Sequence, residues 1–67
     1  MRERMLHVNG NDLAVEIRSA RDRAILTQDE LGRKLGVSTR TIQGWEAGVI
    51  PQPKHRRAVL EFIKEAA

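Results

Sequence analysis

The 67-residue chain lacks the residues that most often cross-link a small protein through disulfides or a bound metal ion. It contains no cysteine, so neither a disulfide nor a thiolate metal site is available. Its two histidines, His7 and His55, stand far apart in the sequence and do not form a zinc-binding pattern. A chain of this length has room for one domain with a marginal core. We therefore expect stability to come from helix packing, with a partner subunit as a possible further source.

Aromatic residues, long apolar runs and catalytic patterns are also scarce. Trp45 and Phe62 are the only aromatic residues, which argues against a stacking platform for single-stranded nucleic acid. No apolar run approaches the ~20 residues that span a bilayer, and residues 1–10 contain no apolar stretch of signal-peptide length. The sequence shows no paired carboxylates, no nucleophile–base pattern and no phosphate loop. We therefore expect a cytoplasmic protein that is not an enzyme and uses no cofactor or metal.

Positive charge is what the chain carries in excess. The formal net charge is +3, and between positions 33 and 57 a single acid, Glu46, stands against six bases. Those bases are Arg33, Lys34, Arg40, Lys54, Arg56 and Arg57. Taken alone, such a segment is more often a solvated surface than a binding site, although it also suits an anionic partner such as nucleic acid.

Capping signals and apolar spacing predict a helix at each end of the chain. Asn11 is expected to cap a helix over residues 12–23. The apolar residues of that helix recur at helical spacing and are Leu13, Ile17, Ala20 and Ala24. A last helix is expected over residues 53–65, with Pro53 in its first turn. Its core stripe consists of Val59, Phe62, Ile63 and Ala66.

Between these two helices, residues 27–48 have the lengths of a helix-turn-helix. Thr27 and Glu30 fit a capping box, in which each side chain binds the backbone amide of the other residue. The helix that follows is expected over residues 28–35. Gly36 stands directly after it, where glycine favours a left-handed C-terminal cap.

A second helix of this motif is expected over residues 39–47, with Ser38 as its N-cap and Gly48 at its C-terminal end. Gly32 supplies the small residue that the crossing of the two helices needs. The apolar residues that would face one another across the motif are Leu31, Leu35, Val37, Ile42 and Trp45. The requirements of a helix-turn-helix are therefore met together.

Residues 27–48 resemble the phage repressor and Cro class of helix-turn-helix proteins. The ending Trp45-Glu46-Ala47-Gly48, followed by Pro53, is typical of that class, and the resemblance extends over residues 12–63. It implies an all-α, compact bundle of four to five short helices, like the DNA-binding domain of lambda repressor. Residues 11–67 would form this domain, and residues 1–10 would be an N-terminal arm.

The resemblance also implies which residues contact DNA. The base-contacting positions are Thr39, Arg40, Gln43 and Gly44. The phosphate-contacting positions are Gln28, Ser38, Thr41, Lys54, Arg33 and Arg56. Arg40 is the strongest candidate for specificity, because a guanidinium group can pair bidentately with guanine. Gly44 offers no side chain at a position that often reads a base. For each residue, the competing interpretation is an ordinary solvated surface position.

A structural set is implied as well, and it consists of Gly32, Gly36, Ile42, Trp45, Arg21 and Glu46. Ile42 and Trp45 would point into the core. Arg21 and Glu46 would form an ion pair that ties the first helix to the third. Ile25 departs from the family, which commonly has glycine there. Because a β-branched residue is poor in left-handed geometry, we expect the first helix to run further or the turn to differ.

The function implied is that of a small, stand-alone Cro-like regulator that represses transcription. From its length we expect the protein to have no ligand-sensing domain. A palindromic operator would call for a homodimer. Candidate residues for the dimer surface are Met5, Leu6, Val8 and Leu60. An antitoxin that neutralises a protein partner and regulates its own promoter is the alternative. Arg2 and Arg4 suggest that residues 1–10 form a basic arm that reaches DNA, and the competing interpretation is a frayed terminus. Residues 5–8 are the only candidate strand in the sequence.

Overall fold

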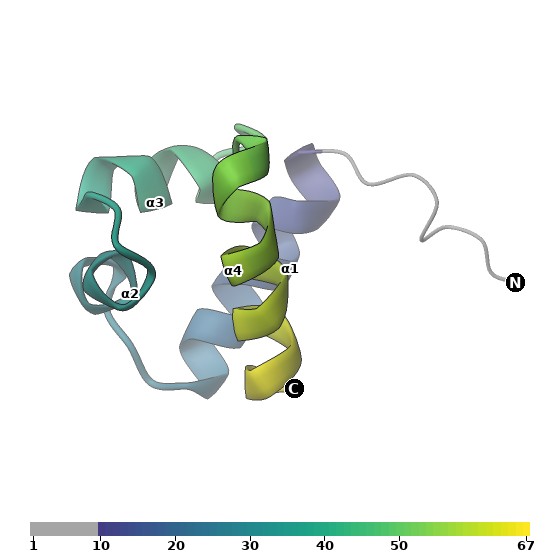
Figure 1. Ribbon diagram of the computed structural model, residues 1–67. Coiled ribbons are helices and arrows are strands. Elements are labelled where there is room, and N and C mark those ends of the chain that lie inside the picture. The colour runs from purple at the N-terminus through teal and green to yellow at the C-terminus, as the bar shows by residue number, and fades with distance from the viewer. Residues whose placement is uncertain (1–9) are drawn as a thin grey trace, which may run out of the picture.

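The computed structural model describes residues 10–67, and over this range the chain forms four helices. In chain order these are α1 (Gly10–Arg23), α2 (Gln28–Leu35), α3 (Thr39–Glu46) and α4 (Pro53–Ala66). Helices α1 and α4 pack side by side in one half of the molecule, and α2 and α3 form the other half (Figure 1). The all-α fold predicted from the sequence is confirmed.

Three helix boundaries differ from the predicted ones. Helix α1 begins at Gly10 and already includes Asn11, so the prediction that Asn11 caps the helix is wrong. Helix α3 ends at Glu46, one residue early, with Ala47 as its C-cap, because the chain leaves the helical conformation at Gly48, whose φ is 114°. Helix α4 continues to Ala66. The arm was predicted over residues 1–10, but Gly10 is the first residue of α1. The rest of the arm, with the candidate strand and Met5, Leu6 and Val8 of the candidate dimer surface, lies outside the described residues.

The two ends of α2 follow the predicted cap chemistry. The Glu30 amide donates to Thr27 Oγ1 at 3.0 Å, and the Thr27 amide donates to Glu30 Oε1 at 2.8 Å. At the other end, Gly36 adopts the left-handed conformation with φ 77°. Because both signals are local, the helix has the bounds that the sequence predicted.

The turn after α1 corrects the expectation about Ile25. Helix α1 ends at Arg23 and does not run further, and Ile25 adopts the left-handed conformation with φ 57°. The amides of Ile25 and Leu26 bond back to the carbonyls of Asp22 and Arg21, each at 3.1 Å. The Arg21 guanidinium also donates to the Leu26 carbonyl at 2.9 Å. These contacts, and the packing of Leu26 on the core, offset a left-handed cost of about 1–2 kcal/mol.

All four helices contribute to one core. Its buried side chains are Leu13, Ile17, Ala20, Leu31, Ile42, Trp45, Val59 and Phe62. Partly buried residues pack against this core, and they are Leu26, Leu35, Val37, Ile63 and Ala66. Ala24 is exposed, so its predicted place in the stripe of α1 is wrong, because the helix ends one residue before it.

The close approach of α2 to the following turn depends on Gly32. A Cβ atom at this position would lie 2.7 Å from the Val37 carbonyl oxygen and 3.3 Å from the Ser38 carbonyl carbon. Both neighbours are backbone atoms, so an alanine would require the turn to shift. In this chain the glycine therefore sets how closely α2 and α3 approach one another.

Candidate nucleic-acid interface

Helix α3 is anchored through its inner face. Ile42 is completely buried and Trp45 is 3% exposed. At its start, Ser38 Oγ accepts a hydrogen bond from the Thr41 amide at 3.1 Å, as expected of an N-cap residue. The first turn of α3 is therefore fixed by the cap, and the rest of the helix is fixed by the core.

A buried carboxylate ties the end of α3 to α1. The Arg21 Nε and Nη2 atoms donate to Glu46 Oε2 and Oε1 at 2.7 and 3.1 Å. The ion pair that the resemblance implied is thus present, and the two side chains are only 16% and 2% exposed. Burial by itself raises the pKa of Glu46, but hydrogen bonds from Arg21 and Gln28 and the nearby arginine charges more than offset this. The pKa of Glu46 consequently lies below its usual value.

The same carboxylate also reaches α2. Gln28 Nε2 donates to Glu46 Oε1 at 3.1 Å, and Gln28 Oε1 accepts a long hydrogen bond of 3.4 Å from Gln43 Nε2. A chain of contacts therefore runs from α1 through Glu46 and Gln28 to the outer side of α3. The Gln28 side chain, which the sequence assigned to a phosphate, is already partnered within the protein.

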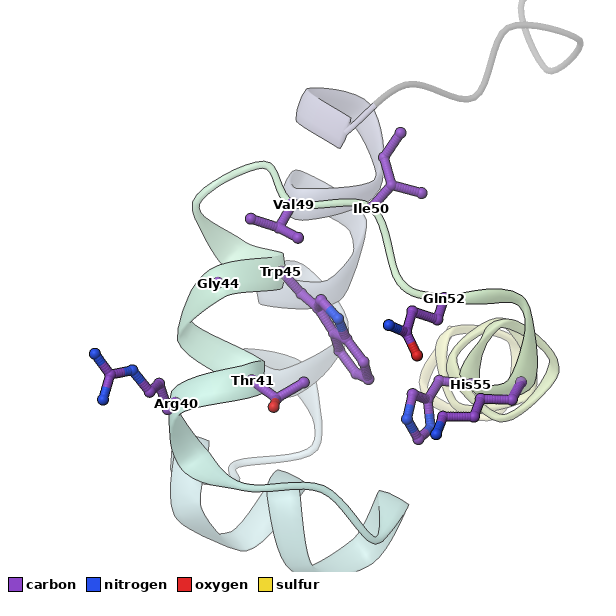
Figure 2. Close-up of a pocket in the computed structure, with 9 residues that line it drawn as sticks. Arg40, Thr41, Gly44, Trp45, Val49, Ile50, Gln52 and His55 are labelled. Atoms are coloured by element: carbon purple, nitrogen blue, oxygen red, sulfur yellow. The ribbon is translucent and has the colours of Figure 1, made fainter.

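The outer face of α3 carries the predicted base-contacting residues. Arg40 and Gln43 are exposed, and Gly44 is half-buried. Arg40 has no hydrogen bond or ion pair among residues 10–67 and extends away from the helix (Figure 2). Binding of its guanidinium to an external acceptor would therefore break no hydrogen bond within this part of the chain.

The start of α3 is linked to α2 by Asp29, a residue that the sequence interpretation missed. Thr39 Oγ1 donates to Asp29 Oδ1 at 2.9 Å, and Asp29 also forms an ion pair with Arg33 at 2.9 Å. The hydroxyl proton of Thr39 is thus engaged, which leaves its methyl group for an outside contact. The charge of Arg33 is partly balanced before any phosphate approaches. Only the i, i+4 spacing of Asp29 and Arg33 could have been seen in the sequence.

A cleft opens between α3 and the first turn of α4 (Figure 2). Its polar and charged lining residues are Arg40, Thr41, Gln52, Lys54 and His55. The apolar part of the lining consists of Trp45, Val49 and Ile50, with Gly44 beside them. His55 lies against Trp45, with the two ring centroids 5.8 Å apart. Cationic and apolar groups therefore meet along one side of α3, which suits a ligand with an anionic backbone and apolar groups.

The structure does not bring every predicted residue to this cleft. Thr41 and Lys54 line it together with Arg40. Ser38 instead bonds to Thr41, with 3.0 Å between the two hydroxyl oxygens. Arg56 lines a second hollow on the outer side of α4, together with Arg57, Leu60, Glu61 and Lys64. The residues of the cleft that the sequence interpretation missed are Val49, Ile50, Gln52 and His55. The first three lie in a loop, which has no periodicity from which a facing direction can be inferred, and His55 lies in the first turn of α4.

Among residues 10–67, no group of three or more acidic, histidine or cysteine side chains is placed to hold a metal ion. In the same part of the chain, no helix is both long and apolar enough to cross a membrane.

The comparison with protein families gives one match. A family model described as helix-turn-helix matches residues 17–63, which is more than half of the chain and includes α2, α3, the second half of α1 and most of α4. No curated protein and no solved structure matches the chain significantly. The matched region contains the capped α2, the turn at Gly36 and the exposed face of α3. The chain therefore belongs to the helix-turn-helix family of the Cro and phage-repressor type, and it is a DNA-binding transcriptional regulator.

Proposed function

We propose that the protein is a sequence-specific repressor of the Cro type, which reads double-stranded DNA by inserting α3 into the major groove. The observation that carries this proposal is the outer face of α3. Arg40 is exposed and has no partner among the described residues, while the inner face of the same helix is buried and hydrogen-bonded. A rigid helix that presents a free guanidinium suits recognition of guanine O6 and N7.

The other base-contacting roles follow from the remaining side-chain groups. Gln43 presents an amide that suits an adenine edge. Thr39 offers its methyl group to thymine, because its hydroxyl donates to Asp29. Gly44 has no side chain with which to contact a base, and Val49 lies beside it. We therefore assign specificity mainly to the first two turns of α3.

Phosphate contacts are proposed for residues around this helix. Lys54 and Thr41 line the cleft beside Arg40 and suit a strand that crosses it. Ser38 and Gln28 lie at the first turns of α3 and α2, where helix amides attract anions. Arg33 adds charge on α2. For Arg56, which lines another hollow, we propose only an outer phosphate contact.

We further propose that the protein acts on a palindromic or pseudo-palindromic operator as a homodimer, in the cytoplasm where its DNA partner lies. A single helix-turn-helix contacts too few base pairs for strong specificity, and two-fold symmetry doubles the reading surface. Leu60 is 49% exposed on α4 and is the described candidate for the dimer surface. Residues 11–67 are proposed as the DNA-binding domain.

An antitoxin is the second candidate. The hollow around Leu60 lies outside the cleft beside α3 and combines an apolar side chain with charges of both signs, which suits a protein partner. A small protein that copurifies with the chain, or a toxin gene beside its own gene, would favour this function over a plain repressor.

Selection of bound sequences from a random DNA pool tests the proposed function. We expect enrichment of one motif with two related half-sites. Sedimentation of the complex with this DNA should show two protein chains per site. Non-specific binding to DNA weakens steeply as the salt concentration rises. The selection is therefore carried out at two salt concentrations, the higher of which suppresses non-specific binding. A pool that shows no enriched motif at either concentration would contradict sequence-specific recognition.

A further inference from the structure

The DNA-facing side of α3 has a gap at Gly44. Arg40 and Gly44 are four residues apart, so they lie on the same face of the helix, one turn from each other. Arg40 extends from this face, whereas Gly44 has no side chain with which to contact a base. At position 44 this face of α3 thus offers only backbone.

A side chain from the following loop lies over this gap. Gly48 has φ 114°, and the chain reverses there so that the Val49 amide donates to the Gly44 carbonyl at 2.9 Å. A Cβ atom on Gly44 would be 3.7 Å from Val49 Cγ2 and 3.9 Å from Val49 Cβ, which is ordinary van der Waals contact. The isopropyl group of Val49 therefore occupies the space beside Gly44, above the last turn of α3 (Figure 2).

Val49 is also accessible from outside. It is 60% exposed, and it lines the cleft that contains Arg40, Thr41 and Lys54. Its neighbour Ile50 is 48% exposed and points to the other side of the loop in Figure 2. A single exposed valine is ordinary on a protein surface. An exposed valine fixed by a backbone hydrogen bond over a missing side chain, on the face that carries Arg40, is more specific.

We propose that Val49 supplies the base contact that Gly44 lacks, and that it recognises the C5-methyl group of thymine. An isopropyl group makes only apolar contacts, and the thymine methyl is the apolar group that base pairs present in the major groove. This inference rests on the proposed function, because it requires α3 to lie in that groove. Val49 is accordingly a specificity-determining residue outside the recognition helix.

Replacement of thymine by deoxyuridine tests the proposal, because deoxyuridine lacks only the methyl group. In the DNA site selected for the wild-type protein, each thymine is replaced in turn and binding is measured by fluorescence anisotropy. For the wild type we expect a loss of about fourfold at the thymine of each half-site that Val49 contacts, in addition to any loss at a thymine that Thr39 contacts. A fourfold loss corresponds to about 0.8 kcal/mol for one buried methyl group. For Val49→Ala we expect this methyl effect to fall below about twofold at that thymine and to persist at any other.

Val15→Ala is the matched control. Val15 is 65% exposed on α1 and does not line the cleft, so this variant should bind DNA as the wild type does. Thermal unfolding of both variants checks the fold, and we expect midpoints close to that of the wild type because both side chains are exposed.

The outcomes separate the inference from the proposed function. If the wild type selects no sequence, the proposed function fails and this inference fails with it. If it selects a site, but the methyl effect is unchanged in Val49→Ala or the site contains no thymine that senses its methyl group, only the inference is overturned. A Val49→Ala variant that binds all sequences less well and sediments as a monomer would also overturn it, because Val49 would then belong to a dimer interface.

Discussion

The two faces of α3 differ in how far their side chains are already engaged. On the inner face, Ile42 and Trp45 are buried, and Glu46 accepts hydrogen bonds from two other helices. On the outer face, Arg40 has no partner among the described residues, and Gln43 makes one long hydrogen bond. The inner face therefore fixes where the helix lies, and the outer face is left for an external partner. Substitutions on the two faces should consequently affect different measurements.

The largest effect is expected for Trp45→Ala on the inner face. Truncation of a buried tryptophan leaves a cavity among four helices and typically costs about 3–5 kcal/mol. A domain of this size has little more stability than that to lose. Urea unfolding followed by circular dichroism measures the change, with Val15→Ala on the exposed side of α1 as the control. A variant as stable as the wild type that has lost only DNA binding would place Trp45 on the reading surface.

Arg21→Ala should cost about as much, or slightly less. The substitution leaves the Glu46 carboxylate buried without its two guanidinium hydrogen bonds, and removal of one partner of such a pair costs about 3–5 kcal/mol. Arg18→Ala is the control. The Arg18 side chain is 62% exposed and lies 3.8 Å from the same carboxylate, too far for a hydrogen bond. Equal stability of the two variants would show that the pair contributes nothing to the position of α3.

The pH dependence of stability should depend on the same carboxylate. The pKa of Glu46 is lowered in the folded protein, so its contribution is present above the ordinary glutamate value of 4.5 and is lost as the pH falls through the lower folded value. Glu46→Gln has no such titration. We expect the difference in unfolding free energy between wild type and Glu46→Gln to be largest near neutral pH and to shrink on acidification. A difference that is constant down to acidic pH would contradict a charged, paired Glu46.

On the outer face, Arg40→Ala should leave stability unchanged and weaken binding to the selected site by about 1–3 kcal/mol. The loss should be concentrated at one base pair, because a bidentate contact to guanine is lost there. Binding to a panel of single-base variants of the site measures this. If Arg40→Ala weakens binding to every member of the panel equally, Arg40 contacts phosphate and does not read a base.

Lys54→Ala should have the smallest effect. Lys54 lines the cleft from the first turn of α4 and is proposed to contact phosphate, so its loss should weaken binding to all sequences alike. The slope of log K against log salt should fall by about 1. A loss confined to certain sequences would contradict a phosphate contact.

The sequence predicted those features that depend on local chemistry. The capping box of Thr27 and Glu30, the left-handed Gly36 and the bounds of α2 are each determined by neighbouring residues. The apolar spacing of α3 likewise placed Ile42 and Trp45 in the core. A helix-turn-helix has such local signals at the ends of its helices and in its turn, so this part of the fold could be predicted from the sequence.

Apart from the Arg21–Glu46 pair, which the family resemblance implied, several features that depend on tertiary contacts were not predicted. Ile25 takes a left-handed conformation because Arg21 and Leu26 stabilise the turn around it. The contact of Asp29 with Thr39 joins residues ten positions apart, and the place of Val49 over Gly44 depends on the reversal of the chain at Gly48. Such contacts depend on how two elements pack against each other, and no periodic pattern in a single sequence indicates that packing.

Cross-saturation from DNA protons to the backbone amides of the protein tests the central claim most directly, since it detects which surface lies against DNA. With the selected site as ligand, we predict the strongest transfer at Arg40, Gln43 and Gly44, with weaker transfer at Lys54. The inner face of α3 should receive little. Strong transfer at Arg56 and Leu60, with none along α3, would contradict the account, because DNA would then bind the outer side of α4.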